Sequence, residues 1–178
     1  MKTVLNEQQL AITIKRLSRQ LLENHMGLRD TVIIGIQPRG VYLSDHVVDE
    51  LKTLVPPEDI QYGKLDITFY RDDIRKGILI PNHTVIPFSI ENKNVVIIDD
   101  VLHTGRTVRA ALDALLDFGR PSRVELFTLI DRRFSRELPI QPDYVGKCID
   151  SILSQRVKVC WKPRDGAQEV LLLEADGA

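Results

Sequence analysis

The sequence is short of cysteine, of long apolar runs and of net charge, and each shortage excludes a class of protein. Its two cysteines, Cys148 and Cys160, are too far apart for a CxxC motif, so we expect reduced thiols in a cytoplasmic protein. No apolar run approaches the roughly 20 residues of a membrane helix, and the N-terminal residues turn polar too early for a signal peptide. Lysine plus arginine number 24 and aspartate plus glutamate 25, so any nucleic-acid site must be a local basic patch. We expect no membrane partner.

Several catalytic signatures are absent as well. The sequence contains no G-x-x-x-x-G-K-[ST], no G-x-G-x-x-G, no G-x-S-x-G and no H-E-x-x-H. The four histidines are scattered without the spacing of metal ligands. The sequence therefore gives no sign of these familiar chemistries.

The most informative stretch covers residues 95–107. It begins with four apolar residues that do not alternate with polar ones, which indicates a strand buried on both faces of a parallel sheet. Two acids, Asp99 and Asp100, follow, and a turn rich in Thr and Gly then leads into a helix-patterned segment, residues 108–118.

This arrangement has the features of a phosphate site beside a pair of acids. The turn follows the carboxyl end of a strand, where open α/β sheets bind ligands, and the N–H groups of Thr104 to Thr107 at a helix N-terminus suit a phosphate. The two carboxylates repel phosphate, so they must serve sugar hydroxyls or a metal, and the combination indicates a phosphorylated ribose. The alternative is an ordinary turn in which Asp100 or Thr104 caps the helix.

Strand and helix patterns alternate along the chain. We predict helices at residues 6–24, 41–54 and 108–118, with Asn6 as the N-cap of the first. We predict strands at 31–36, 65–69, 84–88, 95–98 and 124–130, an irregular segment at 139–147, and closing strands at 157–161 and 170–173. The pattern predicts an α/β fold with a doubly wound, mainly parallel sheet flanked by helices, in a single domain of residues 1–178. The N- and C-terminal segments do not fit the alternation and would form a small hood over one edge.

Two further loops follow predicted strands. In the loop at residues 36–40, Gly40 allows close backbone approach and Arg39 offers a planar fork of donors for phosphate oxygens. The isomer of the Gln37–Pro38 bond is open at this point. The polar segment of residues 71–82, which begins with Arg71, indicates a mobile loop. The alternative for residues 36–40 is an ordinary strand-to-helix turn, and the alternative for residues 71–82 is a solvated run of charges without a function.

Residues 95–107 resemble the thirteen-residue phosphoribosyl diphosphate (PRPP) signature of type I phosphoribosyltransferases. The resemblance implies that the loop at residues 36–40 binds pyrophosphate. It also implies that the loop after Phe69 closes over the reacting centre and excludes water.

The wider sequence resembles the bifunctional pyrimidine operon regulatory protein/uracil phosphoribosyltransferase family, the PyrR family. The segments that carry this resemblance are residues 65–73, 101–109, 119–122, 136–140 and 143–147. It implies the reaction uracil + PRPP → UMP + diphosphate with magnesium, binding of the pyrimidine operon leader RNA, and a homo-oligomer, dimeric or higher. Diphosphate would leave with magnesium and Arg39 neutralising its charge, and uracil would attack an oxocarbenium-like ribose.

The resemblance assigns roles to individual residues. Asp99, Asp100 and Arg39 would be catalytic, with the two acids on the ribose hydroxyls; the residues that hold the metal stay unknown. The substrate-binding residues would be Pro38, Arg39, Gly40, Arg71, Asp99, Asp100, Val101, Leu102, His103, Thr104, Gly105, Arg106, Thr107, Arg132 and Val157. For Val157 the alternative is an ordinary core residue.

The chain departs from the family pattern in two places. One residue is inserted and a Gly is lost in the segment of residues 131–140, and Lys15 and Arg19 replace the Thr and His of RNA-binding members. Lys15, Arg19 and Lys147 are candidate RNA contacts, and the alternative is a solvated helix face. Two other functions stay open: a non-catalytic, nucleotide-sensing RNA-binding attenuator, and a purine or orotate phosphoribosyltransferase.

Overall fold

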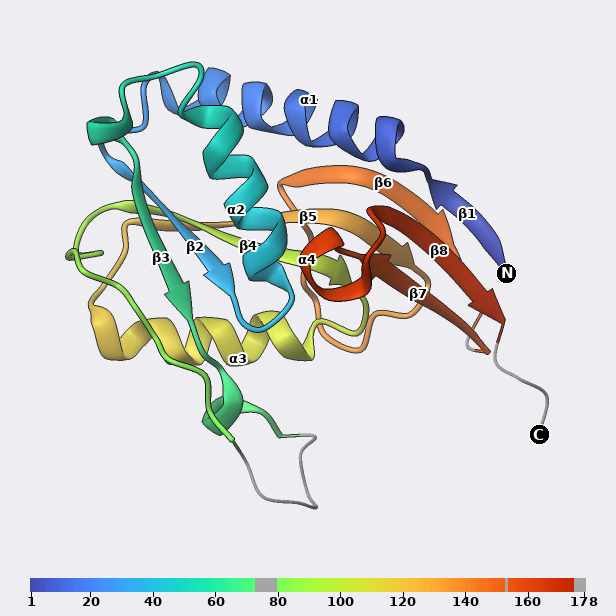
Figure 1. Cartoon of the computed structure of the whole chain (residues 1–178). Helices are drawn as coiled ribbons and strands as arrows, with labels where there is room; N and C mark the ends of the chain where they lie inside the picture. Colours follow the sequence, from blue (N-terminus) through green and yellow to red (C-terminus); the bar gives the residue numbers. More distant parts are fainter. Residues whose placement is uncertain (73–79, 153, 175–178) are drawn as a thin grey trace.

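The main sheet of the computed structural model, which describes residues 1–72, 80–152 and 154–174, is parallel throughout (Figure 1). Within those ranges it has five strands in the order β3-β2-β4-β5-β6. They are β2 (Thr31–Ile36), β3 (Gln61–Leu65), β4 (Asn94–Leu102), β5 (Arg123–Arg133) and β6 (Tyr144–Asp150). The predicted doubly wound parallel sheet is therefore confirmed.

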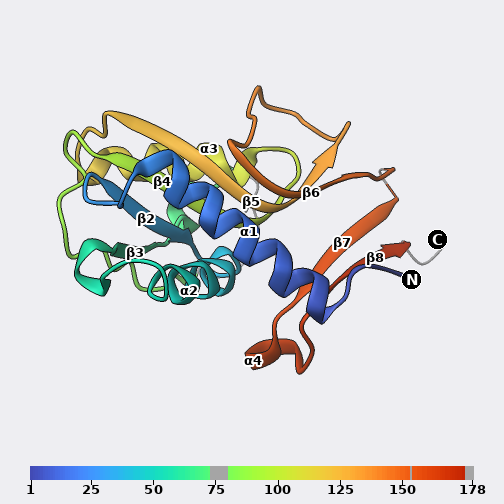
Figure 2. The same ribbon diagram turned by 90° about the horizontal axis from the view of Figure 1, so that it is seen from above.

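Helices cover both faces of this sheet. Helices α1 (Glu7–His25) and α2 (Gly40–Leu51) lie on one face and α3 (Arg106–Leu115) on the other, as Figures 1 and 2 show. Successive strand residues point to opposite faces, so Ile33 packs with α1 and α2 whereas Val32 and Ile34 pack with α3. This two-sided burial explains the unbroken apolar runs in the sequence. Among the described residues, no helix combines the length and the apolarity needed to cross a membrane.

A second, antiparallel sheet forms the hood. Its strands are β1 (Lys2–Leu5), β7 (Gln155–Cys160) and β8 (Glu169–Glu174) in the order β1-β8-β7, and the short α4 (Lys162–Asp165) lies between β7 and β8. Leu5, Val159 and Val170 belong to the same apolar core as α1 and α2. The predicted hood is confirmed, although the sequence did not reveal β1, which has only four residues.

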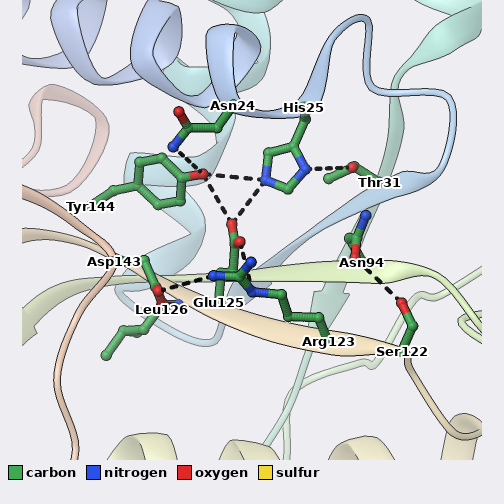
Figure 3. A network of polar contacts seen from close by, with 10 residues as sticks. All are labelled: Asn24, His25, Thr31, Asn94, Ser122, Arg123, Glu125, Leu126, Asp143 and Tyr144. Atoms are coloured by element: carbon green, nitrogen blue, oxygen red, sulfur yellow. Dashed lines mark hydrogen bonds and ion pairs between the residues drawn. The ribbon is translucent and has the colours of Figure 1, made fainter.

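Helix α1 is fixed at both ends by local polar contacts. Asn6 and Gln9 form a reciprocal capping box at its start, as the predicted N-cap requires. At its end, the buried His25 contacts Glu125 of β5 at 2.8 Å and Thr31 of β2 at 2.9 Å (Figure 3). The Tyr144 hydroxyl donates to the same Glu125 carboxylate at 2.9 Å. The network ties α1 to three strands at the end of the sheet opposite the predicted phosphate turn.

Three predicted segments differ in the structure. The strand expected at residues 65–69 ends at Leu65, because the Asp66 carboxylate accepts the N–H and the hydroxyl of Thr68 and turns the chain. The strand expected at residues 84–88 reduces to one bridge between Val85 and Lys64, since Pro87 has no N–H to extend it. The segment expected to be irregular contains the start of β6, which pairs with β5 from Tyr144 onward.

Candidate active site

The candidate site lies where β2, β3, β4 and β5 end. A cavity of about 340 Å³ opens after β4, and its lining comes mainly from the predicted phosphate turn. The lining residues are Arg71, Asp99, Val101, Leu102, His103, Thr104, Gly105, Arg106, Thr107, Val108 and Glu137. The structure thus brings together nearly all residues predicted from the stretch 95–107, together with Arg71 from the loop after β3.

The phosphate turn is held from behind by the segment that follows β5. The N–H groups of Glu137 and Leu138 donate to the Thr104 carbonyl at 3.0 and 3.2 Å. Gly105 has φ +94° at the start of α3, and an added β-carbon would lie 3.2 Å from Ile140. The N-cap residue Gly105 has no side chain to cap α3, and the Thr104 hydroxyl accepts the Arg106 N–H at 3.4 Å. The N–H groups at the start of this helix face the turn, as a phosphate site requires.

Asp99 and Asp100 are both almost fully buried at the end of β4, with 8 and 5% of their surfaces exposed. Asp99 accepts the N–H of Asp100 at 3.0 Å, and Arg39 Nε donates to Asp100 Oδ2 at 3.0 Å. Burial raises the pKa of both carboxyls, and the charge of Asp100 raises the pKa of Asp99 further. Arg39 acts in the opposite direction and lowers the pKa of Asp100. Groups that donate hydrogen bonds here, such as sugar hydroxyls, would favour the ionised pair.

The loop after β2 brings Arg39 to these acids. The Gln37–Pro38 peptide bond is cis, and the Gln37 N–H donates to the Leu65 carbonyl at the end of β3. Arg39 also donates through Nη2 to the carbonyl of Val159 in the hood. Arg39 therefore links the loop, β4 and β7, and it lies next to the cavity rather than in its lining.

Only the beginning of the loop predicted to close over the site can be described. Arg71 Nη1 donates to the Thr107 hydroxyl at 3.2 Å, and Asp72 pairs with Arg106 at 2.9 Å. These contacts join the start of the loop to the first turn of α3. Residues 73–79 of the predicted loop lie outside the described ranges.

Arg132 and Val157 do not line the cavity. The buried Arg132 donates to the Ser151 hydroxyl and to the Gln155 carbonyl, both at 2.8 Å, and burial lowers its pKa. Its charge nevertheless contributes to lowering the pKa of His103 in the phosphate turn, after burial as the main cause. Val157 pairs with Leu172 in the hood, and its side chain packs in the core.

Two site neighbours were not assigned a role from the sequence. Arg136 donates to the carbonyl of His103 and pairs with Asp131, so it joins the phosphate turn to the end of β5. Trp161, just after β7, is fully buried close to Asp100. The segment of residues 136–140 already carries part of the family resemblance, which is the signal that points to Arg136. No sequence signal marks Trp161.

The candidate RNA contacts do not gather into one basic patch. Lys15 lies at a hollow of about 260 Å³ that also includes Asp49 and Glu50, and Arg19 pairs with Glu50 at 3.2 Å. Lys147 of β6 donates to the Val4 carbonyl at 3.1 Å. Acidic side chains thus lie beside the two α1 residues, whereas Lys147 lies on β6, where the carbonyls of Val145 and Gly146 accept hydrogen bonds from Arg16 of α1.

Comparisons with known proteins agree with this geometry. The model of the phosphoribosyl transferase domain matches residues 1–164. The bifunctional protein pyrR of Enterococcus faecalis is 42% identical over 167 residues, which cover 91% of this chain and 93% of that protein. The bifunctional protein PyrR of Actinobacillus pleuropneumoniae is 44% identical over 176 residues, with 98 and 97% covered.

Solved structures show the same fold. A hypoxanthine phosphoribosyltransferase from Staphylococcus aureus has a TM-score of 0.63 and 25% identity, covering 83% of this chain and 77% of its own. The hypoxanthine phosphoribosyl transferase of Trypanosoma cruzi has a TM-score of 0.70 at 18% identity, with 97 and 91% covered. The second likeness concerns the fold alone.

Proposed function

We infer the activity from one premise: this chain belongs to the phosphoribosyl transferase family and, within it, to the bifunctional PyrR proteins. It is a uracil phosphoribosyltransferase that converts uracil and PRPP into UMP and diphosphate. The observation that carries this conclusion is the phosphate turn beside two buried carboxylates at the end of β4. A phosphorylated ribose is the ligand that offers both a phosphate and hydroxyls at this spacing.

Different site residues bind different parts of the substrates. The N–H groups of residues 104–107 receive the 5′-phosphate, with Val101, Leu102 and His103 shaping the approach to the turn. Asp99 and Asp100 accept the ribose hydroxyls, and their pair of negative charges also favours the sugar cation that develops as the leaving group departs. Pro38, Arg39 and Gly40 receive the diphosphate, and Arg71 approaches it from the loop after β3. Arg132 and Val157 lie outside the cavity lining; the family resemblance assigns Arg132 to the side of PRPP and the Val157 backbone to the side of the base.

The mechanism is electrostatic and needs no protein nucleophile. Arg39 neutralises charge on the departing diphosphate, and the buried surroundings of Asp99 and Asp100 strengthen every such interaction by excluding water. Uracil then attacks the oxocarbenium-like ribose through its own ring nitrogen. Closure of the loop that begins at Arg71 would keep water from taking the place of uracil.

Magnesium fits this site as a partner of the substrate. No group of three or more His, Cys, Asp or Glu side chains in the described ranges could hold a metal by itself. Magnesium is usually held by one or two carboxylates together with substrate phosphates and water, and Asp99 and Asp100 provide such carboxylates beside the PRPP site. When bound, the ion would supply positive charge to the diphosphate.

We propose that the chain also regulates transcription by binding pyrimidine operon leader RNA, with UMP and PRPP as the signals. The name of the relatives, bifunctional, supports an enzyme with a second role rather than a sensor alone. Lys147 is the best placed of the candidate contacts, since Lys15 and Arg19 have acidic neighbours. We further propose a single cytoplasmic domain that forms a homo-oligomer; its shared core between hood and main sheet supports the single domain.

The decisive experiment measures UMP formation from uracil, PRPP and magnesium, with EDTA as the control. Hypoxanthine, guanine and orotate serve as competing acceptors. Metal-dependent turnover with a preference for uracil supports the proposal. A preference for a purine or for orotate would show that uracil is not the substrate. Binding of PRPP without any turnover would favour the non-catalytic, nucleotide-sensing attenuator.

RNA binding is tested separately by gel shift with pyrimidine leader RNA over a range of salt. Binding through phosphate contacts must weaken steeply from low to physiological salt. Lys147→Gln should weaken RNA binding. The matched control is Lys52→Gln, which changes an exposed lysine that follows α2 and pairs with Asp49. If the RNA shows no gel shift even at low salt, the proposed regulatory role is ruled out, whereas the proposed enzymatic activity is unaffected.

A further inference from the structure

Arg39 already has two partners before any substrate arrives. Its Nε donates to Asp100 at 3.0 Å, and its Nη2 donates to the Val159 carbonyl. The inference below rests on the proposed function, in which the same guanidinium binds the departing diphosphate. To do so, Arg39 must release at least part of its hold on Asp100.

Asp100 cannot lose this donor without consequence. Only 5% of its surface is exposed, so water has little access to replace the lost donor. A buried carboxylate that loses a hydrogen-bond donor changes its orientation unless another donor takes its place. A change of orientation would disturb the ribose at the moment the diphosphate leaves.

Trp161 offers a second donor at the same place. The indole is fully buried, and its Nε1 has no partner with hydrogen-bond geometry among the described residues. It nevertheless lies close enough to Asp100 to lower the pKa of that carboxyl. An indole N–H is a donor only, and buried tryptophans usually find an acceptor for it. The Asp100 carboxylate is an acceptor at this place, and in the proposed function its donor Arg39 moves to the diphosphate.

The ring is held firmly in this position. It stacks on His46 at 5.4 Å and on Tyr42 at 6.3 Å between ring centroids, both on α2. The Trp161 backbone N–H donates to Asp165 at 3.0 Å. Helix α2 begins directly after Arg39, so the ring packs against the helix that Arg39 precedes.

We propose that Trp161 is a positioning residue, whose indole N–H donates to Asp100 when Arg39 turns to the diphosphate. A carboxylate has two oxygens and accepts several donors, so the exchange keeps the Asp100 carboxylate hydrogen-bonded and oriented throughout. The opposing interpretation is that Trp161 only fills space between the hood and α2. Space filling requires the ring but not its N–H, and this difference defines the experiment.

The chain contains a single tryptophan, so one indole N–H signal reports on this contact in an NMR spectrum. On titration with magnesium diphosphate, we expect that signal to move downfield, as a hydrogen bond to a carboxylate requires. In unliganded Arg39→Gln the signal should already lie near the liganded position, because the competing donor is gone. A signal that stays in place in both experiments overturns the proposal.

Activity provides the second measurement. Replacing Trp161 by 3-benzothienylalanine keeps the ring but exchanges the N–H for sulfur, and we expect about a tenfold loss of kcat, the size associated with one hydrogen bond to a charged group. Tyr42→Phe is the matched control: it retains the ring that stacks on Trp161 and leaves the indole N–H in place, so kcat should be unchanged. Equal kcat for the sulfur variant and the wild type means that Trp161 only fills space.

The two proposals fail in different ways. If wild-type protein makes no UMP and does not bind diphosphate, the proposed function falls, and the signal of unliganded Arg39→Gln decides the role of Trp161. If the wild type makes UMP but the sulfur variant is equally active, only the role of Trp161 is lost.

Discussion

A β-carbon placed on Gly40 would lie 2.3 Å from the backbone oxygen of Ile98 and 3.0 Å from the Cα of Asp99. The start of α2 therefore rests directly on the strand that carries the two acids, and both obstacles are backbone atoms that cannot rotate away. Gly40→Ala should displace Arg39 from Asp100. We expect at least a tenfold loss of turnover and a loss of about 1–3 kcal/mol in the free energy of unfolding, typical of overpacking.

Urea unfolding and steady-state kinetics measure the two effects of Gly40→Ala. Gly166→Ala is the control, because nothing lies within 4 Å of its added β-carbon and its cost comes from the positive φ of 72° alone. It should keep full turnover. Wild-type kinetics in Gly40→Ala would mean that the close approach has no part in placing Arg39.

Arg39→Ala and Asp100→Asn should each lower turnover at least tenfold while the protein remains folded. Each removes one side of the 3.0 Å hydrogen bond between them and also one proposed contact to PRPP. Because the two residues share this bond, the double variant should lose less than the product of the single losses. Steady-state kinetics with circular dichroism as the test of folding provides the measurement; a near-normal rate in either variant contradicts its assignment.

Arg136 should affect PRPP binding more than the chemical step. Its side chain joins Asp131 to the carbonyl of His103, so Arg136→Gln releases the phosphate turn from the end of β5. We expect the KM for PRPP to rise about tenfold, with a smaller change in kcat. Arg133→Gln is the control, since the Arg133–Asp150 pair is half exposed and such pairs contribute little. Equal KM values for both variants would exclude this role for Arg136.

The raised pKa values of Asp99 and Asp100 predict how stability depends on pH. Between the ordinary value of 3.8 and the raised pKa, the folded chain binds more protons than the unfolded chain. Stability contributed by these groups therefore falls as pH rises through that window. Asp99→Asn cannot ionise, so it should be more thermostable than the wild type in alkaline, PRPP-free buffer, and the difference should shrink as the pH approaches 4.

Thermal unfolding from pH 4 to 9 in EDTA measures this difference. The control is Asp49→Asn, which changes an exposed carboxylate paired with Lys52 and should leave the profile nearly parallel to that of the wild type. Parallel profiles for Asp99→Asn and the wild type would mean that Asp99 ionises in the folded protein as easily as in water.

The sequence predicted best what depends on local pattern. The unbroken apolar residues 95–98 required a strand buried on both faces, and the structure places α3 on one face and α1 and α2 on the other. Asn6 was recognised as an N-cap because capping depends on residues three positions apart. The strand predicted at residues 65–69 was wrong because a local contact overrides the alternating pattern there. The Asp66 side chain accepts hydrogen bonds from Thr68 and forms an Asx turn that ends the strand.

What the sequence could not give were contacts between distant segments. Arg136 reaches His103 across 33 positions, and the Trp161 indole comes to Asp100 only after the hood has folded over β4. Lys15 and Arg19 form part of a basic stretch in the sequence, but in the fold acidic side chains of α2 lie beside them. The cis form of Gln37–Pro38 likewise depends on the fold around it rather than on the dipeptide.

The pairing of β1 with β8 gives the site a particular order of assembly during synthesis. The first strand of the chain has no partner until residues 169–174 have left the ribosome, and β7 likewise needs β8 beside it. A nascent chain that has already completed β2, β4 and the phosphate turn therefore still lacks the hood carbonyl that Arg39 contacts. The site is therefore complete only once β8 has been synthesised, so turnover should begin only after translation has passed this strand.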